Sequence, residues 1–393
     1  MSRPTRIAIL GTALALVGAS VLPGGASAVG RTAAPSAGAA AIQTVVSDPG
    51  TDAAAPALSF SGRYIAYVAT RRDQTSPRQQ IRRADLSAGG SELLNPSIDG
   101  GVAFGNNSRP PVISADGSRV AFTSTGARLV AADTNGRPDA FVRDASTNTT
   151  LLTSTASDGT VSTGRSGMTS LSKSGRYAVF TSTGTDVVSG STTTNADVYR
   201  RDLATNTTVQ VTVRPDGAPS RGPGSTSTDV SADGNLVAFS SYNSDLATAD
   251  GVDQETDLFV RTMSTGQTRW LSAGLPLGAN PSGVVISPDG RWVSSRWEDG
   301  SLHLTRVDSG STSTVTADGY ALLGAFSSQL GRFVYLSGGT PHVLDLATGR
   351  ATTIATPGGG AVTTVTISGN GRFAAFDWVP ADGGPSVIVR VAL

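Results

Sequence analysis

The stretch Ile286-Ser-Pro-Asp-Gly-Arg-Trp-Val-Ser-Ser295 returns, with variations, six more times along the chain. Each copy has an apolar residue, Ser, two or three variable residues, Gly and then an aromatic or branched run. The other copies begin at Leu58, Ile113, Leu171, Val230, Phe326 and Ile367. A spacing of roughly 40 to 60 residues leaves room for four short strands per repeat and predicts an all-β fold, a seven-bladed β-propeller.

Four strands, A to D from the axis outward, are expected in each blade. Strand A ends at the Ser, which should hydrogen-bond within the turn, and strand B is the run after the Gly, because Gly accepts a positive φ at little cost. Strand C is clearest at residues 139–144, 197–202 and 257–262. Strand D is a Thr-rich run such as 150–154, and β-branched and aromatic residues support both assignments.

The last repeat reaches Leu393 without a strand D of its own. Residues 42–47, ahead of the first strand A, have the sequence of an isolated strand D. We expect this segment to lie on the outside of the seventh blade, where it completes four strands, covers an exposed edge and closes the ring.

The first 28 residues have the layout of a secretory signal peptide. Arg3 and Arg6 precede an apolar run, and Ala26-Ser-Ala28 offers a cleavage site after Ala28. Residues 29–40 form an Ala-, Gly- and Pro-rich flexible leader, and the propeller occupies residues 41–393. No segment is long and apolar enough to span a membrane. We therefore expect a protein that is secreted, or released into the cell-envelope space.

Composition narrows the possible chemistry. The chain has no Cys, which removes disulfides, thiolate metal sites and cysteine nucleophiles. Thirty basic residues balance thirty acidic ones, and basic runs do not exceed two residues. The positive surface of a nucleic-acid binder is therefore missing, so we expect no nucleic-acid partner. We also expect the chain to be monomeric.

Strand direction divides the connections between two faces. The A–B and C–D turns are short and share one face, whereas the B–C and D–A connections share the other and are long in blades 1 to 4. Examples are residues 123–138, 181–196 and 240–256. Long loops on a rigid scaffold are usually where function lies, so we expect binding on the loop-rich face.

A candidate cation loop contains Asp133, Asn135 and Asp139, with oxygen side chains at alternate positions around a Gly turn. It lacks the bidentate acid that ends an EF-hand loop. Asp197 and Asp257 repeat the position of Asp139 in the next two blades. A repeated structural role, in which these acids cap loop amides, is therefore favoured over Ca²⁺, which stays an alternative.

Two tryptophans are candidate ligand-binding residues. Trp297 and Trp378 end strand B in blades 5 and 7, where other blades carry small residues such as Ser124, Ser182 and Ser241. An exposed pair of indoles would stack on a sugar or anchor a peptide. The alternative is that they fill the space left by shorter loops.

Tyr242, Arg71 and Arg72 are further candidate ligand-binding residues. His303 and His342 fall in or beside strand C, away from the axis and without a matched carboxylate. We expect them to be surface or hydrogen-bonded side chains rather than metal ligands or general bases.

The phrase that begins at Ile286 resembles the WD40-like repeat of TolB-type propellers, and the resemblance covers about residues 41–393. It implies an exported bacterial propeller and says little about activity, because such propellers serve as binding platforms and as polysaccharide-processing enzymes. The α/β domain that precedes the TolB propeller has no counterpart here.

Two functions remain open. The first is a non-catalytic binding propeller that recognises a protein, a peptide or a cell-envelope glycan on its loop-rich face. The second is a polysaccharide lyase or glycosidase on the same scaffold. An enzyme of that kind needs paired acids or metal-bound His near the axis, and the sequence favours binding.

Overall fold

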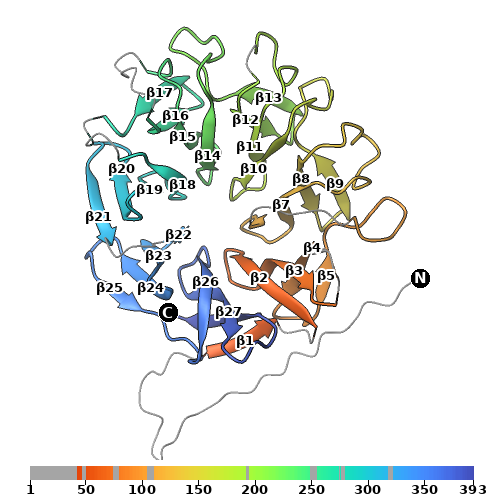
Figure 1. Ribbon diagram of the computed structural model, residues 1–393, viewed down its shortest axis with the longest axis vertical. Coiled ribbons are helices and arrows are strands. Elements are labelled where there is room, and N and C mark those ends of the chain that lie inside the picture. The colour runs from red at the N-terminus through yellow and green to blue at the C-terminus, as the bar shows by residue number, and fades with distance from the viewer. Residues whose placement is uncertain are drawn as a thin grey trace, which may run out of the picture.

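The computed structural model describes residues 42–46, 50–73, 79–103, 110–191, 194–247, 255–273, 275, 279–316 and 322–393. These residues form 28 strands in seven four-stranded antiparallel sheets. The sheets are arranged as the blades of a ring around a central axis (Figure 1). The seven-bladed β-propeller predicted from the repeat is therefore confirmed. The expected signal peptide and leader lie outside the described residues.

Blades 1 to 6 run from an inner to an outer strand in sequence order, whereas the outer strand of blade 7 is the first strand of the chain. Blades 1 to 4 consist of β2 (Thr51–Leu58), β3 (Tyr64–Arg71), β4 (Gln79–Asp85) and β5 (Ser91–Leu93); β6 (Val112–Ile113), β7 (Arg119–Ser124), β8 (Asp139–Asp144) and β9 (Thr149–Leu152); β10 (Ser166–Leu171), β11 (Tyr177–Ser182), β12 (Asp197–Asp202) and β13 (Thr207–Gln210); and β14 (Ser225–Val230), β15 (Leu236–Ser241), β16 (Asp257–Thr262) and β17 (Gln267–Trp270).

Blades 5 and 6 consist of β18 (Ser282–Ile286), β19 (Trp292–Arg296), β20 (Leu302–Arg306) and β21 (Thr312–Thr316); and β22 (Leu322–Phe326), β23 (Arg332–Ser337), β24 (Thr340–Asp345) and β25 (Ala351–Thr353). Blade 7 contributes β26 (Gly360–Ile367), β27 (Phe373–Pro380) and β28 (Val387–Ala392). In blades 2 to 4, strand C has the predicted bounds, whereas strand D of blade 2 begins one residue earlier than predicted.

The ring closes through its first strand. β1 (Ile42–Val46) pairs antiparallel with β28, with Ile42 opposite Val391 and Val46 opposite Ile388. Val45 and Val46 are buried in a cluster that joins blades 7 and 1. The N-terminal strand therefore supplies strand D of the last blade, as expected from the unpaired run at residues 42–47.

The repeated turn does the same work in every blade. Its Ser accepts a hydrogen bond from the first residue of strand B, as in Tyr64 N to Ser59 Oγ at 3.0 Å and Phe373 N to Ser368 Oγ at 3.0 Å. The turn glycine has a positive φ in every blade and, except for Gly331 in blade 6, lies against the preceding blade. A Cβ on Gly117 would meet the Tyr64 ring at 2.2 Å. The phrase thus sets both the hairpin and the spacing between blades.

The inner strands carry β-bulges at corresponding places, as at Ala54/Ala57 in β2 and Ser225/Ser227 in β14. A bulge bends a strand and increases its twist. One residue of each bulge, Ala57 and Ser227, lines the central cavity, where the seven inner strands converge.

Candidate functional site

The loop-rich face is on the side that strand direction predicted. The ends of strand B and the starts of strand A are paired there, as for Arg71 opposite Thr51 and Ser241 opposite Ser225. The long connections are not without structure, however. The D–A connections at residues 95–103, 154–162 and 212–220 each form a small Asp-Gly hairpin closed by an isolated bridge, such as Thr155 with Val161.

Each hairpin docks on the B–C loop of the following blade. Asp99 pairs with Arg128 at 2.9 Å, Thr163 N donates to Asp186 at 2.9 Å, and Arg221 N donates to Asp245 at 3.0 Å. Each of these B–C loops also buries one aliphatic side chain, namely Leu129, Val187 or Leu246. We call the three hairpins, with the described B–C residues 125–138, 183–191 and 242–247, the loop rim.

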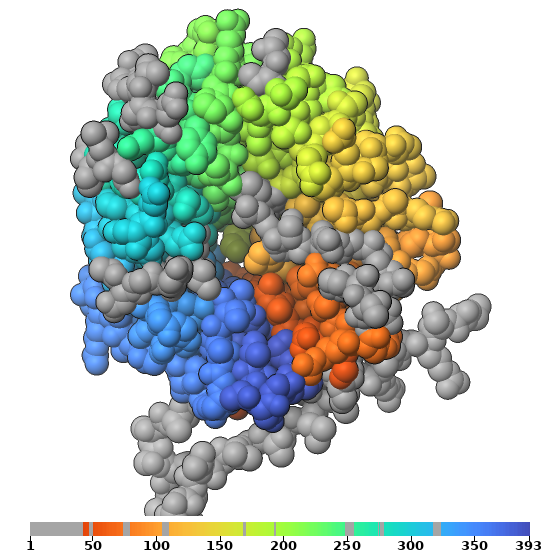
Figure 2. Space-filling view, in the orientation of Figure 1, coloured from red at the N-terminus to blue at the C-terminus, as the bar shows by residue number. Residues whose placement is uncertain are grey.

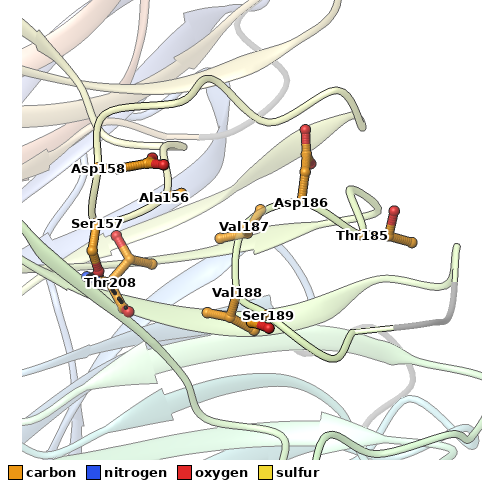
Figure 3. Close-up of a pocket in the computed structure, with 9 residues that line it drawn as sticks. All are labelled: Ala156, Ser157, Asp158, Thr185, Asp186, Val187, Val188, Ser189 and Thr208. Carbon is orange, nitrogen blue, oxygen red and sulfur yellow. Dashed lines mark hydrogen bonds between the residues drawn. The ribbon is translucent and has the colours of Figure 1, made fainter.

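A pocket of about 500 Å³ opens on the outer part of the loop rim in blade 3. Figure 3 shows Asp158 on one side of this pocket and Asp186 with Thr185 on the other, with Val187 and Val188 between them. Hydroxyl groups complete the lining. Ser157 Oγ accepts a hydrogen bond from Thr208 N at 2.9 Å and so ties the hairpin of blade 2 to β13.

Trp297 and Trp378 do not form a pair of exposed indoles. Trp378 is only 7% exposed and packs in the core of blade 7. Trp297 is half-buried and stacks on His303, with ring centroids 3.5 Å apart. Both therefore fill space beside short loops. In blades 2 to 4 the same position holds a buried Ser whose Oγ accepts a loop amide, as for Gly184 N to Ser182 Oγ at 3.1 Å.

The remaining candidate residues come from separate blades. Tyr242 is 40% exposed beside blade 4. Arg71 pairs with Asp73, and Arg72 contacts Asp52 at 3.5 Å while donating to Gly383 O. Arg72 thus joins blade 1 to blade 7, whereas the Asp73 partner of Arg71 lies in the same loop. No described contact joins the predicted residues into one site.

The acids at the start of strand C have a structural role, but their partners differ from those expected. Asp139 is fully buried and accepts from Ser154 Oγ at 2.6 Å and from Asn135 Nδ2 at 2.7 Å, and not from loop amides. Asp197 accepts from the Thr212 hydroxyl at 2.7 Å in the same way. Burial raises the pKa of Asp139 to about 6, and nearby Asp133 adds to this shift.

These bonds leave the cation loop poorly arranged for Ca²⁺, because hydrogen-bond donors already face both oxygens of Asp139. The Asn135 carbonyl oxygen accepts from Arg137 N at 2.7 Å. Across the described residues, no three His, Asp or Glu side chains lie close enough together to hold one metal ion.

His303 is hydrogen-bonded, as expected, through Nε2 to Ser301 Oγ at 2.7 Å. His342 stacks on Tyr335, with ring centroids 5.2 Å apart. Burial lowers the pKa of both imidazoles.

A central cavity of about 350 Å³ is lined by the inner strands of all seven blades, and Figure 2 shows a hollow at the centre of the ring. Lys173 and Asp229 lie in this cavity. Burial lowers the pKa of Lys173 and raises that of Asp229. Sequence reasoning missed this pair, although Lys173 stands out as the only lysine of the chain.

Comparisons with solved structures support the fold. An oligogalacturonate lyase in complex with manganese aligns with a TM-score of 0.56 and 11% identity, over 90% of this chain and 93% of that one. The β-propeller domain of the trilobed protease from Pyrococcus furiosus, described with an open velcro topology, aligns with a TM-score of 0.56 and 12% identity over 87% and 95%. At such identities the likeness defines the class of protein, a β-propeller.

No family model matches the chain. No curated protein matches it either. Along the part of the chain that the structure describes, no helix has the length and apolar character needed to cross a membrane.

Proposed function

We propose that the chain is an exported, non-catalytic binding propeller that holds a protein, peptide or cell-envelope glycan on the loop rim of blades 1 to 4. The observation that carries the proposal is the docking of each rim hairpin on the next B–C loop. Loops that are fixed by hydrogen bonds and buried aliphatic side chains lose little conformational entropy when a ligand binds. The shorter connections of blades 5 and 7 are joined by fewer bonds, such as Glu298 N to Ala279 O at 3.2 Å, and their described residues form no hairpin closed by an isolated bridge.

The rim pocket suits a ligand rich in hydroxyl or amide groups. Its lining combines the carboxylates of Asp158 and Asp186 with the hydroxyls of Ser157, Thr185 and Ser189. Carboxylates accept hydrogen bonds from sugar hydroxyls and peptide amides, and hydroxyl side chains both donate and accept. Export rests on the N-terminal 28 residues. N-terminal sequencing of the secreted protein should read from Val29.

The alternative, a polysaccharide lyase or glycosidase, would use Asp158 and Asp186 as an acid pair. A glycosidase needs one carboxylic acid whose pKa is raised, so that it donates a proton at neutral pH. The hydrogen bond from Thr160 N instead lowers the pKa of Asp158. Asp186 accepts hydrogen bonds from Thr163 N with both oxygens, which is a docking role. The geometry therefore favours binding.

A glycan and peptide array, followed by titration of the best ligand, tests the proposal. Asp158→Ala and Tyr242→Ala should each weaken binding about fivefold, because both side chains are exposed on the loop-rich face. Asn148→Gly is the matched control on the opposite turns, where Gly accepts the same positive φ of 59°. An affinity lost in Asn148→Gly and kept in the rim variants would assign binding to the other face. Depolymerisation of a glycan by the wild type would favour the enzyme.

A further inference from the structure

Within the described part of the chain, no hydrogen-bond or ion-pair partner accounts for the buried position of the Lys173 ammonium. It lies in the A–B turn of blade 3, between Ser172 and Ser174, and lines the central cavity. Its backbone carbonyl accepts from Ala115 N at 2.8 Å. Its ammonium makes no hydrogen bond or ion pair with any of the described residues. The residue as a whole is partly exposed.

The nearest acid already has another role. Asp229 in β14 accepts from the Ser170 hydroxyl with one oxygen and from Ile286 N at 2.9 Å with the other. It therefore joins the inner strands of blades 3, 4 and 5. Burial lowers the pKa of Lys173 and the charge of Asp229 opposes this shift, but no ion pair joins the two described groups. The lysine charge remains available to a ligand.

The cavity narrows next to Lys173. The A–B turns of blades 6, 7, 1, 2 and 3 are joined by backbone hydrogen bonds, such as Phe60 N to Ala115 O at 2.8 Å and Asn370 N to Phe60 O at 2.8 Å. The gap that these turns share with Lys173 leaves no room for a water molecule. A ligand in the wider cavity would therefore meet the ammonium at this narrow end.

The walls of the cavity combine apolar residues, such as Ala57, Val112 and Phe326, with hydroxyl-bearing residues such as Ser227 and Thr366. One ammonium against such walls suits a single negative charge on an apolar body, because ligand sites are mostly apolar with a few placed polar groups. A doubly charged phosphate would be disfavoured by the nearby Asp229 carboxylate.

We propose that the central cavity binds a small monocarboxylate with an apolar body, its carboxylate on the Lys173 ammonium. This site is separate from the loop rim and does not depend on the ligand proposed for it. The charge-assisted hydrogen bond to Lys173 supplies the selectivity for an anion, and the inner strands supply the apolar contacts.

The single lysine makes a direct test possible. Reductive methylation with ¹³C-formaldehyde labels only Lys173 and the N-terminal amine, so NMR reports the cavity without ambiguity. Hexanoate should shift the Lys173 signal to saturation, with a Kd in about the millimolar range or tighter. Hexanamide, which has the same apolar body without the charge, should bind at least about tenfold more weakly. The N-terminal signal should not move.

Calorimetric titration of hexanoate into three variants, none of them methylated, completes the test. Lys173→Met should weaken hexanoate binding at least about tenfold, Lys173→Arg should keep most of it, and Arg350→Gln, an exposed cation on blade 6, should change nothing. If Lys173→Met does not fold, Lys173→Arg and the comparison of hexanoate with hexanamide still test the proposal. A Lys173 signal unmoved by hexanoate, equal binding of hexanamide, or full affinity in Lys173→Met would overturn the proposal.

Discussion

Blades 1 to 4 and blades 5 to 7 share one strand plan but finish their loop-rich ends differently. In blades 2 to 4 a small Ser at the end of strand B accepts a loop amide, and the loop buries an aliphatic side chain such as Val187. In blades 5 and 7 the same position holds Trp297 or Trp378, which packs beside a short connection. One small residue thus admits a structured loop, whereas one large residue replaces it.

The difference separates scaffold from surface. We call blades 1 to 4 the long-loop arc and blades 5 to 7 the short-loop arc. The repeated turn and the packing between blades occur in both arcs, so the ring does not depend on the long loops. The long loops occur only where the strand end leaves space for them. We therefore expect changes in the short-loop arc to act on stability and changes on the loop rim to act mainly on binding.

The largest effect should come from the junction of the two arcs. Removal of Ile42–Val46 should lower the free energy of unfolding by about 4 kcal/mol or more, because Val45 and Val46 lose their burial and β28 becomes an exposed edge. Chemical denaturation measures this. An unchanged midpoint would show that the ring does not need β1, and the two arcs would then be closed by other contacts.

A smaller effect tests the tryptophans. Trp378→Ala should cost about 3 kcal/mol, because it leaves a cavity in the core of blade 7. Ile98→Ala on the loop rim, where the side chain is 57% exposed, should cost less than about 0.5 kcal/mol. Thermal melting of both variants compares the arcs. A larger loss in Ile98→Ala than in Trp378→Ala would contradict the division into scaffold and surface.

The smallest effect concerns Asp139 and pH. Its pKa is about 6 in the folded protein, above the ordinary value, so the folded state keeps a proton that the unfolded chain releases. The stabilisation is present below about pH 4 and is lost as pH rises to about 6, a change of about 2 kcal/mol. Asp139→Asn should remove this dependence when denaturation is repeated across that range.

Asp202 serves as a control, because its contribution to stability should change with pH in the opposite direction. The Arg176 guanidinium holds the pKa of Asp202 at about 2, so its contribution is present at neutral pH and is lost as pH falls toward that value. Equal pH profiles for wild type and Asp139→Asn would contradict the assignment for Asp139.

Excess Ca²⁺ should leave the melting temperature of the wild type unchanged. A Ca²⁺-dependent rise that is lost in Asp133→Ala would restore the cation loop.

The candidate site was predicted less well than the fold. The loop-rich face and its bias toward blades 1 to 4 followed from strand direction and loop length. The burial of Trp378 could not be predicted in the same way, because an indole at a strand end has the same sequence pattern whether or not the rest of the protein covers it. The hairpins at residues 95–103, 154–162 and 212–220 were signalled by Asp-Gly pairs, but their docking joins residues from different blades.

The sequence by itself determined the number of blades, the turn of each blade and the strand that closes the ring. These features are local, since a Ser, a Gly with positive φ and an alternating run act within a few residues, and repetition multiplies the signal. Only the tertiary structure decided that Lys173 faces the axis and that Asp139 is buried. Lys173 faces the axis because the inner strands of seven blades converge there, and Asp139 is buried because the folded blade packs Ser154 and Asn135 against it. Neither outcome is recorded in a local sequence pattern.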